Sequence, residues 1–183
     1  NTISPENINS VMLSMLNIIE TIHELFVIHR DIKPDHFMMK DNQLFLIDFG
    51  ISTFYIDDNK QHKENVVGDS IIGSSNYASY NLYDGNSYSR RDDLISIGYI
   101  YMFLYTKELP WETLNKYDYV DTCDLLSIEH KKNIECKKMK GLSELIPKCM
   151  QINDFFTMYM NCCYSLSFLE NPAYITYISL FHE

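Results

Sequence analysis

The sequence predicts a mainly helical fold that carries one small β-hairpin, and three observations lead to this prediction. Apolar residues recur at helical spacing along much of the chain. Two short apolar runs, 36–39 and 44–47, flank a polar tetrapeptide and indicate the two strands of a hairpin. With 183 residues, 46% of them hydrophobic, the chain can bury one core, so we expect a single domain over residues 1–183.

The first helix is expected over residues 7–27, where apolar residues share one helical face. Ser4 is a candidate N-cap with Pro5 in the first turn, and Asn7 is a second candidate cap. This helix leads directly into the polar segment that begins at His29. The hairpin follows, and its turn is expected at residues 40–43.

The second half of the chain is expected to be helical after a long loop. Residues 52–75 are polar and irregular, and long loops inside a domain are usually functional. The apolar run 94–105 indicates a buried helix that opens at 89–93 and is broken at 109–111. Three segments complete the chain: a lysine-rich, solvated helix or loop at 131–140, a helix at 151–166, and a last helix capped by Asn171 and Pro172 that ends near Phe181.

The composition argues against several classes of function. A formal net charge of -10 disfavours nucleic acid and anionic membrane surfaces as partners. The apolar run 94–105 is too short to span a bilayer, and the start of the chain does not resemble a secretory signal. The five cysteines, which form no C-x-x-C pair, predict free thiols in a reducing interior of the cell, cytoplasm or nucleus: Cys123, Cys136, Cys149, Cys162 and Cys163.

Two polar motifs indicate the chemistry. The first is His-Arg-Asp-Ile-Lys-Pro-Asp-His at residues 29–36, and the second is Ile-Asp-Phe-Gly at residues 47–50. Phosphoryl transfer needs an oriented hydroxyl, neutralised phosphate charge and held metal ions. Asp31 is the candidate catalytic base, Lys33 can reach the same side of an extended loop to touch the phosphoryl group, and Asp48 is an oxygen ligand suited to Mg²⁺.

Both motifs resemble those of protein kinases, namely the catalytic loop (29–36) and the metal-binding Asp-Phe-Gly turn (48–50), which opens an activation segment expected at 48–79. Three further segments, 73–79, 89–99 and 109–111, resemble the casein kinase I and vaccinia-related kinase branch, which lacks the Ala-Pro-Glu motif as this chain does. A Lys at position 33 is similar to that of Ser/Thr kinases.

This resemblance runs from about residue 8 to residue 181 and covers the large C-terminal lobe of the α+β kinase fold. It implies ATP and Mg²⁺ as cofactors and a protein with Ser or Thr as the substrate. The Gly-rich loop, the strand Lys and its partner Glu of the small N-terminal lobe have no counterpart in the sequence. We therefore expect a truncated sequence whose missing lobe precedes residue 1, and a fragment with negligible activity by itself.

The resemblance also assigns supporting roles around the catalytic loop. Asp93 is expected to hydrogen-bond the backbone at His29 and Arg30, and Arg30 to steady the chain after Asp48. Ser74 resembles the hydroxyl residue that contacts the catalytic Asp and Lys in Ser/Thr kinases. A solvated loop serine is the alternative.

The chain's three arginines all lie inside these motifs, which fits their use for fixed, bidentate geometry. We expect an anion or activation-loop contact from Arg90 and Arg91, which would place them on the substrate side of the site. A simple surface pair is the alternative interpretation.

His36 is the departure from the family pattern, because the family has Asn at this position to hold the second Mg²⁺. Imidazole suits Zn²⁺ and similar metals better than Mg²⁺. His36 can still donate a hydrogen bond to Asp31, so we expect weaker or metal-altered catalysis with His36 and Asp48 at the cofactor. Two alternatives remain open: one metal suffices, or His36 only packs at the start of the hairpin.

The sequence thus predicts an ATP-dependent Ser/Thr protein kinase of casein kinase I type, represented by its C-terminal lobe. A pseudokinase that acts as a protein-binding module is the alternative. A third hypothesis, an unrelated helical scaffold, requires both motifs to be coincidence.

Overall fold

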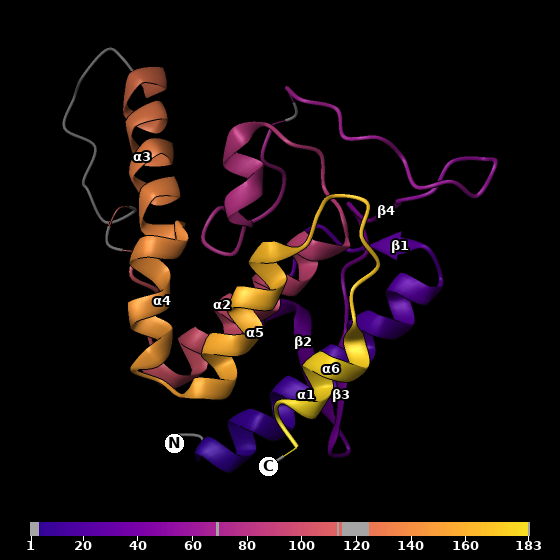
Figure 1. The fold of residues 1–183 in the computed structure, drawn as a ribbon, viewed down its shortest axis with the longest axis vertical. Helices are drawn as coiled ribbons and strands as arrows, with labels where there is room; N and C mark the ends of the chain where they lie inside the picture. Colours follow the sequence, from indigo (N-terminus) through magenta and orange to yellow (C-terminus); the bar gives the residue numbers. More distant parts are fainter. Residues whose placement is uncertain (1–3, 69, 113, 115–124, 183) are drawn as a thin grey trace.

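The computed structural model describes residues 4–68, 70–112, 114 and 125–182, and it is mainly helical with two small antiparallel sheets (Figure 1). The helices are α1 (Pro5–Glu24), α2 (Arg90–Thr106), α3 (Leu125–Lys140), α4 (Leu142–Met150), α5 (Asp154–Ser165) and α6 (Tyr174–Ser179), with the short 3₁₀ helices η1 (Pro34–His36) and η2 (Tyr80–Asp84). The strands are β1 (Val27–Ile28), β2 (Phe37–Lys40), β3 (Gln43–Leu46) and β4 (Thr53–Phe54). The predicted fold class, helices with one small hairpin, is confirmed at this level.

Helix α1 begins as the sequence predicts. The Ser4 side chain accepts a hydrogen bond from the backbone N–H of Asn7 (3.4 Å), and Pro5 occupies the first turn. The helix ends at Glu24, short of the predicted residue 27, because Phe26 adopts a positive φ of 64° and Val27 already pairs in β1. The end of α1 therefore feeds β1 and, directly after it, the polar loop at residue 29.

Two strand pairs bring the two polar motifs together. Strands β2 and β3 form the predicted hairpin, whose turn residues Asp41 and Asn42 have φ values of 49° and 60°, as a two-residue hairpin turn of type I′ requires. Strands β1 and β4 pair Val27 with Phe54. Since β1 precedes the first motif and β4 follows the second, this pairing holds the two motifs side by side.

Helix α2 is the centre of the core. It packs against α1 and α5, and nearly all of its residues from 90 to 102 are buried, which confirms the buried helix expected over 94–105. The aromatic side chains of Tyr101, Phe156 and Phe181 meet around it. In the described part of the chain, no helix combines the length and apolar character needed to cross a membrane.

The C-terminal third differs from the prediction in three details. The segment 131–140 is helical, but its last residue, Lys140, is fully buried rather than solvated. Residues Leu142–Met150 form a separate helix that was not predicted. Ala173, and not Asn171 or Pro172, is the N-cap of α6, because the Asn171 side chain accepts a hydrogen bond from Arg90 instead.

The structure describes four of the five cysteines. Cys149 and Cys163 are buried, Cys136 and Cys162 are half-buried, and all four are free thiols. Cys123 lies outside the described residues.

Helices α2 and α5 pack closely at Gly98. A Cβ atom at this position would collide with the Met160 sulfur and lie 3.3 Å from the Tyr159 ring, and both side chains are fully buried. We expect Gly98→Ala to lower the free energy of unfolding by about 1–3 kcal/mol, although Ala is the better helix former. Urea unfolding measures this. The loss should shrink in a Met160→Ala background, and an unchanged stability of the single variant would contradict the packing argument.

Candidate active site

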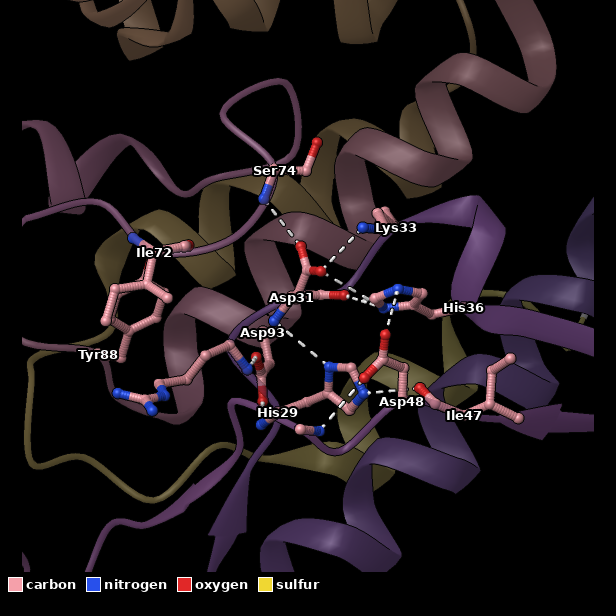
Figure 2. A network of polar contacts seen from close by, with 12 residues as sticks. His29, Asp31, Lys33, His36, Ile47, Asp48, Ile72, Ser74, Tyr88 and Asp93 are labelled. Carbon is pink, nitrogen blue, oxygen red and sulfur yellow. Dashed lines mark hydrogen bonds and ion pairs between the residues drawn. The ribbon is translucent and has the colours of Figure 1, made fainter.

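The Asp31 carboxylate lies at the centre of a network of polar contacts (Figure 2). Its Oδ1 accepts the backbone N–H of Ser74 (2.8 Å), and its Oδ2 accepts Lys33 Nζ (2.9 Å). Lys33 is extended, with φ −154° and ψ 163°, so its side chain returns to the same side as Asp31. Burial raises the pKa of Asp31, but these two hydrogen bonds and the positive charges of Lys33 and His36 outweigh it and hold that pKa below its ordinary value. The carboxylate is therefore ionised at neutral pH.

Gly73 allows this close approach, and the sequence analysis did not assign it a role. It has a φ of 83°, and a Cβ atom there would lie 2.7 Å from Asp31 Oδ1 and 3.1 Å from the Arg30 carbonyl oxygen. Any side chain would push the loop away from Asp31. The available signal was the position of this glycine directly before Ser74.

Asp48 projects from the turn that follows the hairpin, and its side chain is 61% exposed. The positive φ (62°) of this turn falls on Asp48 itself, whose Oδ1 accepts the Gly50 N–H (3.3 Å). The preceding residue is fixed on both sides. The Ile47 N–H donates to the His36 carbonyl (2.9 Å), and the Ile47 carbonyl lies 3.0 Å from His29 Nε2.

His36 lies between the two carboxylates (Figure 2). Its Nδ1 is 2.8 Å from the Asp31 carbonyl oxygen and 3.6 Å from Asp31 Oδ2, and its Nε2 is 3.4 Å from Asp48 Oδ2. A carbonyl oxygen can only accept, so Nδ1 must carry a proton. Asp31, Lys33, His36 and Asp48 thus converge on one place, as the sequence analysis expected.

Asp93, on helix α2, supports the loop by accepting hydrogen bonds from its backbone. It is 2% exposed, its Oδ2 accepts the backbone N–H of His29 (2.8 Å), and its Oδ1 accepts the backbone N–H of Arg30 (3.0 Å). Arg30 has a positive φ of 70°, which is strained for a residue with a side chain, and these hydrogen bonds hold it there. The Arg30 side chain donates to the Ile51 carbonyl (2.5 Å), so both contacts expected for this support are present.

His23 is a supporting residue that the sequence analysis missed. Its Nε2 lies 3.0 Å from Asp93 Oδ2, and its Nδ1 lies 2.5 Å from the Tyr174 hydroxyl. The Tyr55 hydroxyl donates to the His23 carbonyl (2.8 Å). This buried histidine therefore connects the loop support to α6. The signal was a histidine one helical turn after Ile19, on the apolar face of α1.

Three predicted residues make contacts other than those expected. Ser74 reaches Asp31 through its backbone N–H, and its hydroxyl points away from that carboxylate (Figure 2). Arg90 donates to Asn171 Oδ1 (2.7 Å) and to the carbonyls of Leu169 (3.2 Å) and Glu170 (3.1 Å).

Arg91 likewise donates to the Leu166 carbonyl (3.0 Å). Arg90 also contacts the activation segment at Tyr55, whose ring lies 4.5 Å from the Arg90 guanidinium carbon. The expected activation-loop contact is therefore present at Arg90, and both guanidinium groups also bind carbonyl oxygens of the chain between α5 and α6.

The donor groups fit a magnesium ion held mainly by its nucleotide. Within residues 4–68, 70–112, 114 and 125–182, no group of three or more His, Cys, Asp or Glu side chains is arranged to hold a metal. Mg²⁺ in phosphate-transferring sites needs only one or two carboxylates, with phosphates and water as the other ligands. The exposed carboxylate of Asp48 meets that requirement, whereas the imidazole of His36 does not supply oxygen.

Comparisons with known proteins agree with this geometry. The family model described as the protein kinase domain matches residues 1–157. Casein kinase I homolog 2 of Schizosaccharomyces pombe is 34% identical over 180 residues, which is 92% of this chain and 38% of that protein. The chain thus spans little more than a third of the length of this relative.

We expect Asp93→Ala to lower the free energy of unfolding by about 3 kcal/mol or more, because two buried backbone N–H groups lose their acceptor. Chemical denaturation followed by circular dichroism measures this. Asp57→Ala is a matched control, since Asp57 also accepts two backbone N–H groups, those of Asn59 (2.9 Å) and Gln61 (2.8 Å), but in an exposed loop. Equal losses in the two variants would contradict the supporting role of Asp93.

Proposed function

Because the chain belongs to the protein kinase family and is similar to casein kinase I, we propose that it is the C-terminal lobe of an ATP-dependent Ser/Thr protein kinase. The observation that carries this proposal is the convergence of Asp31, Lys33 and Asp48 around His36. In this proposal the catalytic loop is 29–36 and the activation segment is 48–79. We also place the protein in a reducing interior of the cell, as its cysteine pattern predicts.

Asp31 is the proposed catalytic base. Its carboxylate is ionised, and the hydrogen bonds from Lys33 and Ser74 fix its orientation. It orients the hydroxyl of the protein substrate and accepts its proton. Lys33 lies beside this carboxylate and contacts the phosphoryl group as it is transferred. Its ammonium group offsets negative charge on the phosphoryl oxygens.

Asp48 is the proposed ligand of the metal ion that accompanies ATP. Bound Mg²⁺-ATP supplies the phosphoryl group with part of its charge neutralised by the metal. Asp48 suits this role because its carboxylate is exposed and its Oδ2 lies 3.4 Å from His36 Nε2. His36 Nε2 faces the same place, so a metal that accepts nitrogen ligands, such as Mn²⁺ or Zn²⁺, is a better match for the pair than Mg²⁺.

The hairpin offers a surface for a nucleotide-covering lobe. Large apolar side chains are exposed on it and on the adjoining turn: Met38 (54%), Met39 (59%), Phe45 (41%), Ile47 (38%) and Phe49 (44%). Clustered exposed apolar residues mark sites of interaction. Since the chain spans 38% of its relative, we propose that an N-terminal lobe from outside this chain packs here and closes over ATP.

The second candidate function is a pseudokinase that binds partner proteins without transferring phosphate. His36 favours it, because its imidazole holds the place between Asp31 and Asp48 where the family has Asn. A combined activity and binding assay on the full-length protein separates the two candidates.

We expect Asp31→Asn in the full-length protein to reduce phosphoryl transfer by about 10²- to 10⁴-fold, because Asn cannot accept the proton. Transfer from Mg²⁺-ATP to a protein substrate is measured by mass spectrometry. Asp35→Asn is the matched control, since Asp35 is an exposed carboxylate in the same loop and should leave the rate unchanged. If the wild-type protein shows neither phosphoryl transfer nor an ATP-induced thermal shift, the pseudokinase is the function that remains.

We expect His36→Asn to raise the Mg²⁺-supported rate by about 10-fold, because an amide oxygen replaces a ring nitrogen beside Asp48. The ratio of the Mn²⁺-supported to the Mg²⁺-supported rate should fall in the same variant. Parallel assays with each metal measure this, with the exposed His182→Asn as control. Rates that do not differ from wild type with either metal would mean that one metal, held by Asp48, suffices.

A further inference from the structure

Lys140, the last residue of α3, has no exposed surface. Its Nζ donates to the carbonyls of Ser75 (2.8 Å) and Ala78 (2.7 Å) and to the Tyr83 hydroxyl (3.2 Å). An ammonium group has three donors, and each of them has an acceptor here. Lysine is almost never fully buried unless its amine is paired, and here the three hydrogen bonds supply that pairing.

Aromatic rings enclose the same amine. Lys140 Nζ lies 4.9 Å from the ring centre of Tyr83, 5.1 Å from that of Tyr99 and 4.9 Å from that of Trp111. The faces of these rings attract a cation. The rings come from η2, α2 and the segment after α2. All three parts precede α3 in the sequence, and they surround its last residue, Lys140.

The segment that Lys140 binds is anchored through every carbonyl from residue 75 to residue 78. The Tyr83 hydroxyl also donates to the Ser75 carbonyl (3.0 Å). Trp111 Nε1 donates to the Asn76 carbonyl (2.7 Å). Ser96 Oγ donates to the Tyr77 carbonyl (2.7 Å). Lys140 donates to the Ala78 carbonyl and, together with the Tyr83 hydroxyl, to the Ser75 carbonyl.

This anchored segment reaches the catalytic carboxylate. Ser74 precedes it and donates its N–H to Asp31 Oδ1, while the Ser74 carbonyl accepts the N–H groups of Tyr77 (3.1 Å) and Ala78 (3.0 Å). Ser75 and Tyr83 also line a groove of ≈ 610 Å³ between residues 70–75, η2 and α3. Lys140 therefore lies behind both the Asp31 contact and the wall of the adjacent groove.

We propose that Lys140 is a positioning residue: it fixes residues 74–78 so that Ser74 holds Asp31 and the adjacent groove keeps its shape for the protein substrate. This inference rests on the proposed kinase function. It concerns use of the protein substrate and not of ATP, because two of the residues that Lys140 binds, Ser75 and Tyr83, line the groove.

The charge of Lys140 gives the proposal a pH dependence. Burial lowers the pKa of Lys140 to about 7, and the nearby Cys136 opposes this shift. The titratable groups facing the amine are Cys136 from α3, Tyr83 from η2 and Tyr99 from α2. The ammonium form donates three hydrogen bonds and the neutral amine donates two, so the anchor weakens as the pH rises above about 7.

The test compares Lys140→Met with Lys138→Met in the full-length protein, since Lys138 is exposed on the same helix. We expect Lys140→Met to lower kcat/KM for the protein substrate by about 10- to 100-fold, with the KM for ATP within about twofold of wild type. Amide hydrogen exchange of residues 74–78 should accelerate by about 10-fold. Lys138→Met should change none of these. The advantage of wild type over Lys140→Met should shrink between pH 6 and pH 9, roughly following the titration of a buried lysine.

Faster exchange with unchanged kcat/KM would assign Lys140 a purely structural role and overturn the proposal, as would unchanged exchange. If Lys140→Met does not fold, Tyr83→Phe removes one acceptor of Lys140 and one donor to Ser75 while keeping the ring. Tyr83→Phe should also lower kcat/KM for the protein substrate while leaving the KM for ATP unchanged, by a smaller factor than Lys140→Met. An unchanged kcat/KM in Tyr83→Phe would overturn the proposal. A wild-type protein without transfer activity would instead refute the kinase function, and the exchange experiment would still decide the anchoring.

Discussion

Two backbone N–H groups at the start of the loop 29–36 donate to one buried carboxylate, that of Asp93. They belong to His29 and Arg30, and Arg30 has a backbone conformation that a residue with a side chain adopts only under constraint. A buried N–H without an acceptor costs about 1–3 kcal/mol, so the loop has no comparably stable alternative conformation while Asp93 is in place. The position of Asp31, one residue further on, follows from this constraint.

Two histidine side chains connect the rest of the site. His29 binds the carbonyl before Asp48, and His36 lies between the two carboxylates, so two imidazole rings set the distance between Asp31 and Asp48. An asparagine at position 36 would offer an oxygen to a metal and a shorter side chain. Under the proposed function, the histidine keeps the two carboxylates connected and favours a metal that accepts nitrogen ligands.

The elements that the sequence predicted well are those whose signals are local. The cap at Ser4, the hairpin around Asp41 and Asn42, and the buried helix after Ser89 all follow from spacing and turn chemistry within a few residues. The two motifs likewise placed Asp31, Lys33 and Asp48 together. The contact of Asp93 with the loop came from family resemblance and not from local pattern.

The features that were missed depend on partners far away in sequence. Lys140 lies in a lysine-rich segment whose composition is typical of a solvated helix. Its burial is explained by the carbonyls of Ser75 and Ala78 and by the surrounding rings. Arg90 and Arg91 looked suited to an anion, but acceptors between α5 and α6 bind them. The role of Gly73 needed the position of Asp31 to be known. No local pattern contains such information.

The distance in sequence between His29 and its acceptor, Asp93, has a consequence for biosynthesis. The two residues lie 64 positions apart, and His23 pairs with Tyr174 across 151 positions. On the ribosome, the nascent loop 29–36 therefore lacks its acceptor until α2 has been translated, and its support is complete only when α6 has been made. Such long-range closure slows folding.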